Sequence, residues 1–338
     1  MTHPSSGAPS MLFPPPPAPT HPCAHRPLTH RVPSGTYFRF ATGGSIDIHT
    51  APSIQGPWVA AGAVLPSNGS RIAYAGARDA WAPDVHRVRG AYVLYYAVST
   101  FGSQESAIGV ATSGSLEAGT WTDRGSTGVS SSAGDDYNAI DPNLIRAGGT
   151  AYLTFGSFWG DIFQTTLASD ALTWSGAAPY GVEFNATGTR PSEGAYMYRH
   201  REYYYLFFSS GICCNYNVVR PAPGDEYKIM VCRSERVDGG YVSPDARGRR
   251  AQSWSRRELT SYAVQVDRSG RACTNSGGTE VLGSHGTVYG PGGQGVYDDP
   301  VLGPVLYYHY VDTDIGYADG QKVLGINRID FSSGWPVV

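Results

Sequence analysis

The chain has 338 residues, a formal net charge of −3, and charged residues at only 16% of its positions. There is no basic excess of the kind that binds nucleic acid, and no apolar run is long enough to cross a bilayer. Aromatic residues reach 12%, with 23 Tyr and 43 Gly. This composition favours one large all-β domain, or two average ones, in an exported protein that binds neutral ligands such as sugars.

The N-terminal residues 1–33 are rich in Pro, His and Ser. We therefore expect a disordered leader or the product of a wrongly assigned exon. The segment lacks the apolar core of about 7 to 15 residues that a signal peptide needs. The cysteines nevertheless indicate export, because four of the five lie within residues 213–273. They predict one or two disulfides, with the pairing left open.

Five strand-like aromatic runs follow along the chain. They begin at Tyr37 (YFRFATG), Tyr92 (YVLYYAVS), Tyr152 (YLTFGSF), Tyr204 (YYLFFSSG) and Leu306 (LYYHYVDT), at intervals of 55, 60, 52 and 102 residues. Each is followed by a second strand pattern and a polar turn that usually closes on Trp. Alternating patterns without helical periodicity, repeated about every 50 residues, predict an all-β fold, a five-bladed β-propeller. The alternative is a β-sandwich whose segments are similar by accident.

The long last interval contains an Arg-rich segment at 244–265, which differs in composition from its neighbours. We interpret it as an insertion, either a surface loop or a translated intron. The predicted organisation is a leader at 1–33 and a propeller domain at 34–338, interrupted at about 244–265.

Two carboxylates stand at matched places in the repeat. Asp141 and Glu193 lie eleven residues before the third and fourth aromatic runs, and Asp84 is a looser equivalent, eight before the second. The innermost strands of a propeller line a channel, so equivalent residues converge there. Carboxylates that face each other across a channel are the groups that cleave glycosidic bonds. The alternatives are an Asx turn before Pro142 and a solvated turn acid.

Several motifs appear in order in the predicted blades: AWAPDV at 80–85, YNAIDPNLI at 137–145, RPSEGAY at 190–196 and YGPGGQGV at 289–296. Together with SSGICCNY and the closing segment from Tyr307, they resemble glycoside hydrolase family 43, and within it the fungal endo-acting arabinanases. The resemblance covers about residues 35–338, except the insertion. It implies a five-bladed propeller that hydrolyses internal α-1,5-L-arabinofuranosidic bonds in the arabinan of pectin, with inversion.

The resemblance also implies roles for single residues. Glu193 would be the general acid, and Asp141 would orient it and raise its pKa through the proximity of a like charge. The residues expected to bind arabinosyl units are Trp81 and Trp159, by stacking, and Asn138 and Ser157, by hydrogen bonds. Packing between blades is the alternative role of the two Trp residues.

The general base is missing from its expected place. In the family it comes from a His-Asp-Pro motif ahead of the first aromatic run, whereas this chain has His25-Arg26-Pro27, with Arg26 eleven residues before Tyr37. Arginine cannot accept a proton at neutral pH. Three accounts are open: a wrongly assigned N-terminal exon, a non-catalytic relative that binds arabinan, or a substitute base at Asp47.

No cofactor is expected to take part in the chemistry. Many relatives hold a structural calcium ion through a histidine, but Gly293 and Gln294 stand where bacterial relatives have His and Asn. His285 is a candidate in a Gly-rich turn, and no metal ligand is assigned. The expected protein is a secreted monomer whose partner is arabinan, not nucleic acid or a membrane. The alternative functions are an exo-acting arabinofuranosidase or xylosidase and an arabinan-binding pseudoenzyme.

Overall fold

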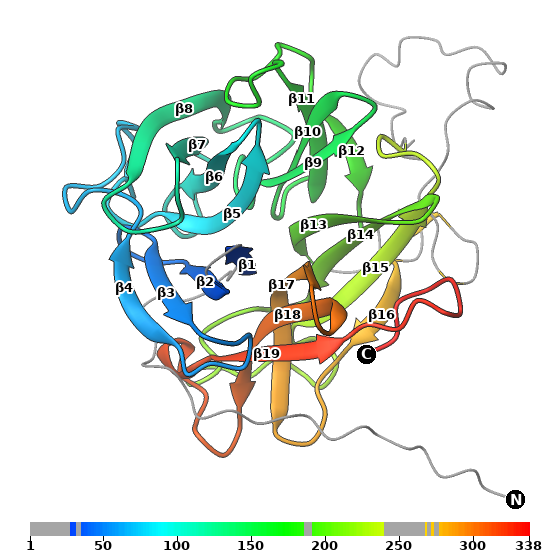
Figure 1. Ribbon diagram of the computed structural model, residues 1–338. Coiled ribbons are helices and arrows are strands. Elements are labelled where there is room, and N and C mark those ends of the chain that lie inside the picture. The colour runs from blue at the N-terminus through cyan, green and yellow to red at the C-terminus, as the bar shows by residue number, and fades with distance from the viewer. Residues whose placement is uncertain (1–27, 32–34, 186–190, 240–267, 269–271, 274–276) are drawn as a thin grey trace, which may run out of the picture.

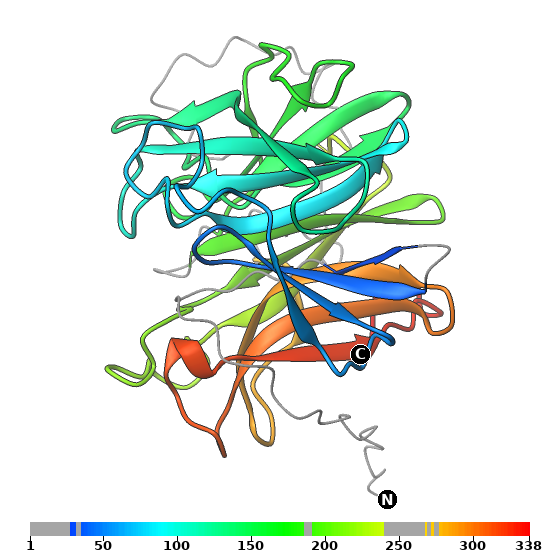
Figure 2. The ribbon, with the colours of Figure 1, turned by 60° about the vertical axis from the view of Figure 1, so that its left-hand side comes forward.

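A computed structural model describes residues 28–31, 35–185, 191–239, 268, 272–273 and 277–338. Five antiparallel sheets surround one axis, seen end-on in Figure 1 and turned by 60° in Figure 2. The described part contains a short 3-10 helix, Asp319–Gln321, and no helix long and apolar enough to cross a membrane. The prediction of an all-β, five-bladed propeller is confirmed.

Each blade is a meander whose consecutive strands pair with one another. Blades 1 and 2 hold β1 (Leu28–Arg31), β2 (Thr36–Ala41), β3 (Asp47–Ala51), β4 (Val59–Ala63), β5 (Trp81–Val88), β6 (Ala91–Val98), β7 (Ser106–Ser113) and β8 (Trp121–Ser131). Blades 3 and 4 hold β9 (Asn143–Ala147), β10 (Thr150–Phe155), β11 (Ile162–Leu167), β12 (Tyr180–Glu183), β13 (Ser192–His200), β14 (Tyr203–Ser210), β15 (Lys228–Ser234) and β16 (Thr279–Leu282). Blade 5 holds β17 (Val288–Asp299), β18 (Gly303–Asp312) and β19 (Val323–Arg328), so within the described residues it has three strands where the repeat predicts four.

The five aromatic runs form the second strands of the blades, and both faces of these strands are covered. In β6, Leu94 and Tyr96 pack against blade 1, whereas Val93 and Tyr95 pack against blade 3. Successive side chains of a strand point to opposite faces. A strand between two other blades therefore buries side chains on both faces, so these second strands are largely apolar along their length rather than alternating as the sequence analysis predicts.

The ring closes by packing between blades 1 and 5, which lie side by side in Figure 1. Tyr37 and Ala51 of blade 1 share a buried cluster with Val305 and Tyr307 of blade 5. The Tyr37 hydroxyl also donates to Asp299 Oδ2 at 2.7 Å. Each described blade is built from consecutive strands, so among the described residues the ring is closed by side-chain contacts.

The first blade begins earlier than the sequence pattern predicts. Residues 28–31, inside the predicted 1–33 leader, form β1 and pair with β2, with Leu28 opposite Arg39 and Arg31 opposite Thr36. The sequence LTHR lacks the aromatic pattern that marks the second strands, so nothing in it identifies a strand. Residues 1–27 and the predicted insertion at 244–265 lie outside the described residues, and what the sequence predicts for them stays a prediction.

Two disulfides settle a pairing that the sequence left open. One joins the adjacent Cys213 and Cys214, and the other joins Cys232 to Cys273 across 41 residues. Cys232 and Cys273 belong to the buried cluster between blades 3 and 4. This second bond therefore lies inside the packed core, whereas the first lies in the loop after β14.

In three blades, one position of the innermost strand carries a side chain that forms a hydrogen bond with the backbone of the next blade. The pairs are Asp84 Oδ2 with the Leu144 N–H (2.7 Å), Asn143 Oδ1 with the Met197 N–H (2.7 Å), and the Tyr196 hydroxyl with the Val296 carbonyl (2.9 Å). Asp84, Asn143 and Tyr196 each stand opposite the residue eleven positions later in the second strand of their own blade. They are therefore one structural position, repeated in blades 2, 3 and 4.

Glycine and tyrosine pack against each other across neighbouring strands. The pairs are Gly109–Tyr96, Gly295–Tyr307 and Gly325–Tyr308. A Cβ atom at these glycines would lie 2.0 to 2.3 Å from the nearest atom of the tyrosine. The ring thus lies over the bare glycine backbone, as aromatic residues commonly do beside glycine in sheets. This packing accounts for part of the high content of both residue types.

We predict that Gly109→Ala lowers the free energy of unfolding by about 1–3 kcal/mol, because the added methyl group overlaps a tyrosine ring that cannot move away. The Tyr96 hydroxyl is fixed by Asp123 and Ser70. Gly114→Ala is the matched control, since a Cβ there meets no atom within 4 Å. Urea unfolding of both variants measures the difference, and equal stabilities would contradict the role assigned to this packing.

Candidate active site

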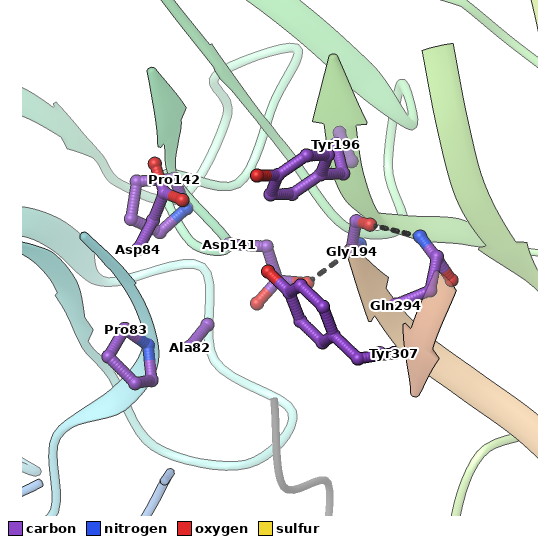
Figure 3. A pocket seen from close by; sticks show the side chains of 11 residues that line it. Ala82, Pro83, Asp84, Asp141, Pro142, Gly194, Tyr196, Gln294 and Tyr307 are labelled. Carbon is purple, nitrogen blue, oxygen red and sulfur yellow. Dashed lines mark hydrogen bonds between the residues drawn. The ribbon is translucent and has the colours of Figure 1, made fainter. Parts of the chain in front are cut away.

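Two cavities meet near the axis of the propeller. A small one of about 20 Å³ lies among the innermost strands, where Figure 3 shows Asp84, Asp141, Tyr196, Gln294 and Tyr307 around it. A larger cleft of about 610 Å³ is lined by loops of blades 2, 3 and 4. Asp141 lines both cavities, so it stands where the axis meets the cleft.

Glu193 is the second residue of β13, and it is buried although it lines the cleft. Two hydroxyl groups hold its carboxyl: Ser157 Oγ donates to Oε2 at 2.5 Å, and the Tyr227 hydroxyl donates to Oε1. Burial and then the charge of Glu193 raise the pKa of Tyr227 well above its ordinary value, so the phenol stays a donor. These contacts give the Glu193 carboxyl one fixed orientation.

Asp141 stands two residues before β9 with a left-handed backbone, at a φ of 57°. Its Oδ2 accepts the N–H of Gly194, the residue directly after Glu193, at 3.0 Å (Figure 3). Burial raises the pKa of Asp141 to about 7, although the Gly194 hydrogen bond opposes this shift. Asp141 therefore retains its proton in mildly acidic solution and is tied to the backbone that carries the second carboxyl group.

Asp141 and Glu193 are brought together without occupying the same repeat position. Asn143 and Tyr196 are equivalent, and they follow Asp141 by two residues and Glu193 by three. Asp141 thus corresponds to Gly194, which has the same left-handed backbone, with a φ of 62°. The predicted match at eleven residues is off by one, because the fourth aromatic run starts one residue earlier in the repeat than the third.

Asp84, the looser equivalent in the sequence, holds blades 2 and 3 together. Its Oδ2 accepts the Leu144 N–H and lies 2.7 Å from His86 Nε2, and its Oδ1 accepts the Asn143 amide at 3.3 Å. It lines the small cavity and is not part of the cleft lining. Its position and its partners fit a structural role rather than contact with a polysaccharide.

The two tryptophans predicted to stack on sugars both line the cleft. Trp159 is 46% exposed, so packing between blades does not explain it. Trp81 is half-buried, and its indole N–H donates to Asp79 Oδ2 at 3.1 Å. An exposed aromatic face in a cleft is the surface on which a sugar ring can stack.

The two predicted hydrogen-bonding residues also line the cleft but are buried and already bound to the protein. Asn138 Oδ1 accepts the Ser106 hydroxyl at 2.7 Å, and Ser157 donates to Glu193. Both side chains thus help to shape the site. Their contact with a sugar stays a prediction.

The structure adds to the site residues that the sequence analysis does not predict to bind a sugar or to hold Glu193. Phe101 and Phe158 are exposed on the lining, and the adjacent Cys213 and Cys214 form another part of it. Tyr227 is 34 residues from Glu193, and nothing local distinguishes it from the many other tyrosines. The sequence FWG, with two aromatic residues in a short polar loop, is the one available hint for Phe158.

The structure tests Asp47 as a substitute for the general base. Arg26 lies outside the described residues. Asp47 is exposed at the first residue of β3 and is absent from the cleft lining, so it does not substitute for the base. The described carboxylates of the lining are Asp141, Glu193 and Asp79, and Asp79 accepts the Gly44 N–H and the Trp81 indole N–H.

The described residues do not fit a metal site built from side chains. No group of three or more His, Cys, Asp or Glu lies together within them. Gln294 binds the Gly194 carbonyl at 2.7 Å and the Ser209 hydroxyl at 2.8 Å, so its amide is used in joining blades 4 and 5. His285 lies in an exposed turn, where Nδ1 contacts the Gly283 carbonyl. The calcium ion stays an untested prediction.

We predict that Asp141→Asn becomes more stable relative to the unmodified protein as the pH rises from about 4 to about 7. The folded protein resists ionisation of Asp141, whereas the unfolded chain ionises near its ordinary pKa, so stability is lost over this interval. The gain for Asn is at most about 4 kcal/mol. Asp170→Asn is the control of opposite sign, because backbone N–H bonds lower the pKa of Asp170. Urea unfolding at several pH values tests both, and a pH-independent difference for Asp141→Asn would contradict the assignment.

Comparison with known proteins agrees with this geometry. Residues 26–336 match Glycosyl hydrolases family 43. An arabinan endo-1,5-α-L-arabinosidase A of Aspergillus aculeatus is 57% identical over 311 residues, 92% of this chain and 89% of that protein. Similar solved structures include the family 43 endo-arabinanase of Bacillus licheniformis (28% identity, TM-score 0.74, 94% of this chain and 98% of that one). Another is an exo-1,5-α-L-arabinanase from a bovine ruminal metagenomic library (27%, 0.73, 94% and 99%). The chain therefore belongs to glycoside hydrolase family 43.

Proposed function

We propose that the protein hydrolyses internal α-1,5-L-arabinofuranosidic bonds of arabinan with inversion. The observation that carries this proposal is a buried pair of carboxyl groups, Asp141 and Glu193, in a cleft that exposes aromatic side chains. Carboxyl groups in such a cleft supply the acid–base chemistry of glycoside hydrolysis. Membership of family 43 and the name of the Aspergillus aculeatus relative support the same reaction.

In this reaction Glu193 protonates the leaving glycosidic oxygen. Ser157 and Tyr227 fix the orientation of its carboxyl. Asp141 accepts a hydrogen bond from the amide directly after Glu193, and burial raises the pKa of Asp141 to about 7. Asp141 is therefore neutral in mildly acidic solution, and in this proposal its role is to orient Glu193 through the backbone.

The shape of the cleft favours endo action. Its lining comes from loops of three consecutive blades, including residues 99–103, 157–159 and 212–215. Phe101, Phe158 and Trp159 offer stacking surfaces along this span. Because an exo-acting structure shares the fold, endo action is inferred from the span of the cleft and not from the fold.

We place the missing general base at position 26 by comparing the chain around two innermost strands. Arg26-Pro27 stands directly before β1, as Asp141-Pro142 stands directly before β9. A carboxylate at position 26 is therefore expected to reach the axis from blade 1, as Asp141 does from blade 3. The chain with Arg26 should bind arabinan and hydrolyse it far more slowly than a chain with Asp at this position.

The proposal includes secretion, action on the arabinan of pectin, and a monomeric state. Two disulfides among the described residues support export, because such bonds persist in oxidising compartments. The acid step assigned to Glu193 requires no cofactor.

The first test is incubation of the purified chain with linear α-1,5-arabinan, with the products sized over time, beside Arg26→Asp and Arg26→Asp/Glu193→Gln. We expect medium-length oligomers from Arg26→Asp at a rate at least about 100-fold above that of the chain with Arg26, since acid–base groups contribute rate factors of about 100 or more. The Glu193→Gln combination should be inactive.

Each contrary result has a distinct meaning. Equal rates with Arg26 and Asp would show that another base acts and would refute the placement at position 26. Monomeric arabinose as the first product would refute endo action. Binding without products from any version would leave the pseudoenzyme.

A second test concerns the aromatic surface. We predict that Trp159→Ala weakens the binding of arabinohexaose about tenfold, because loss of a stacking face costs about 1.4 kcal/mol, while the thermal stability stays unchanged. Val301→Ala is the control, since Val301 is exposed in a turn away from the cleft. Titration calorimetry gives both dissociation constants, and equal values for the two variants would contradict a stacking role.

A further inference from the structure

A third carboxylate holds the strand that carries Glu193. Asp161 directly precedes β11 and is 4% exposed. Its Oδ1 accepts the Ser192 N–H at 3.2 Å, and its Oδ2 accepts the Asn185 N–H at 2.9 Å. The amide directly before Glu193 is therefore bound by Asp161, and the amide directly after it is bound by Asp141. Two carboxyl groups of blade 3 therefore bind the backbone of blade 4 on either side of Glu193.

Asp161 also closes the loop that touches the side chain of Glu193. This loop, residues 156–161, contains Ser157, which donates to Glu193, and the exposed Phe158 and Trp159. The Asp161 N–H donates to the Phe158 carbonyl at 2.7 Å. Phe158, Trp159 and Asp161 all have left-handed backbones, with φ of 55°, 51° and 61°. Such a backbone persists only where its surroundings hold it.

The neighbouring carboxyl group of Glu183 affects the charge of Asp161, which accepts hydrogen bonds from two amide N–H groups. Glu183 is fully buried, opposite Ile162, the residue after Asp161. Burial, and then the charge of Asp161, raise the pKa of Glu183 well above its ordinary value. Burial raises the pKa of Asp161 to about 6. Its two backbone hydrogen bonds oppose this shift, and the charge of Glu193 adds to it. Near neutral pH the proton therefore resides on Glu183, and Asp161 carries the charge that strengthens its hydrogen bonds to N–H groups.

We propose that Asp161 is a positioning residue for catalysis, which holds Glu193 and its partner Ser157 in one geometry by fixing the start of β13 to the 156–161 loop. Asp161 lines neither cavity, so it acts on the reaction through Glu193 and not by contact with substrate. The inference rests on the proposed role of Glu193 as the general acid.

The test uses whichever version of the chain, with Arg or Asp at position 26, releases products from arabinan. Asp161→Asn keeps the size of the side chain, but an amide has one acceptor oxygen, so one of the two N–H groups loses its partner. Two substrates are compared: linear arabinan, whose leaving oxygen needs protonation, and 2,4-dinitrophenyl α-1,5-arabinotrioside, whose phenolate leaves without it.

We expect Asp161→Asn to lower kcat on arabinan by about 10- to 100-fold, because small displacements of a catalytic group have effects of this size. KM should stay within about twofold, and the rate on the aryl substrate within about threefold, since that substrate does not depend on the acid. Asp161→Glu keeps both acceptor oxygens but displaces them by one methylene group. It should show the same selective loss, and it takes the place of Asp161→Asn in the test if that variant does not fold.

Two controls separate this inference from the proposed function. Glu193→Gln should lose activity on arabinan and keep it on the aryl substrate, and an equal loss on both would refute the acid role and the inference with it. Asp123→Asn removes a buried carboxylate that binds the Arg71 and Gly125 amides far from Glu193 along the chain. It should lower stability without changing the ratio of the two activities.

If Glu193→Gln behaves as expected but Asp161→Asn and Asp161→Glu retain full activity, or lose both activities equally, Asp161 is only structural. That outcome overturns the inference and leaves the general acid in place. Absence of products from every version of the chain would end both proposals.

Discussion

Hydrogen bonds between buried side chains and the backbone of the next blade hold the centre of this propeller together, and the arrangement of the site depends on them. The innermost strand of a blade is an edge strand, so one side of its backbone has no strand partner. A buried amide without a partner is costly. Here Asp84, Asn143 and Asp141 supply acceptors to amides of the following blade. The same side chains therefore satisfy the sheet edges and set the distance between blades.

The use of buried side chains as acceptors for backbone amides places some carboxyl groups in the interior, where a negative charge is unfavourable. Asp141, Asp161 and Glu183 are all buried near the start of β13, and burial raises the pKa of each. A structure selected for stability alone would fill these places with neutral acceptors. Asp141 and Asp161 bind the amides on either side of Glu193, so the raised pKa values lie beside the proposed general acid, as perturbed pKa values commonly do at functional sites.

The loop between β10 and β11 links substrate contact to the acid. Within six residues it presents exposed aromatic rings to the cleft, a hydroxyl to Glu193 and a carboxylate to the amide before Glu193. Its left-handed residues leave few alternative conformations. In the proposed function, a sugar that stacks on Trp159 would contact a surface that this loop connects to Glu193, the proposed general acid.

The sequence by itself determined the fold, because a strand covered on both faces must be largely apolar, and five such runs, the first four of them 52 to 60 residues apart, are the pattern that propeller blades require. It also singled out Asp141 and Glu193, since polar residues ahead of each run meet at one place in a propeller, and the resemblance to glycoside hydrolase family 43 added Trp81 and Trp159. Only the tertiary structure decided what depends on contacts between blades. It showed that Asp141 corresponds to Gly194 rather than to Glu193, and that Asp84 joins two blades. It also showed that Tyr227 binds Glu193 and that Asp161 binds the amide of Ser192 directly before it. These partners lie 31 to 60 residues apart in the chain, so no local pattern records them.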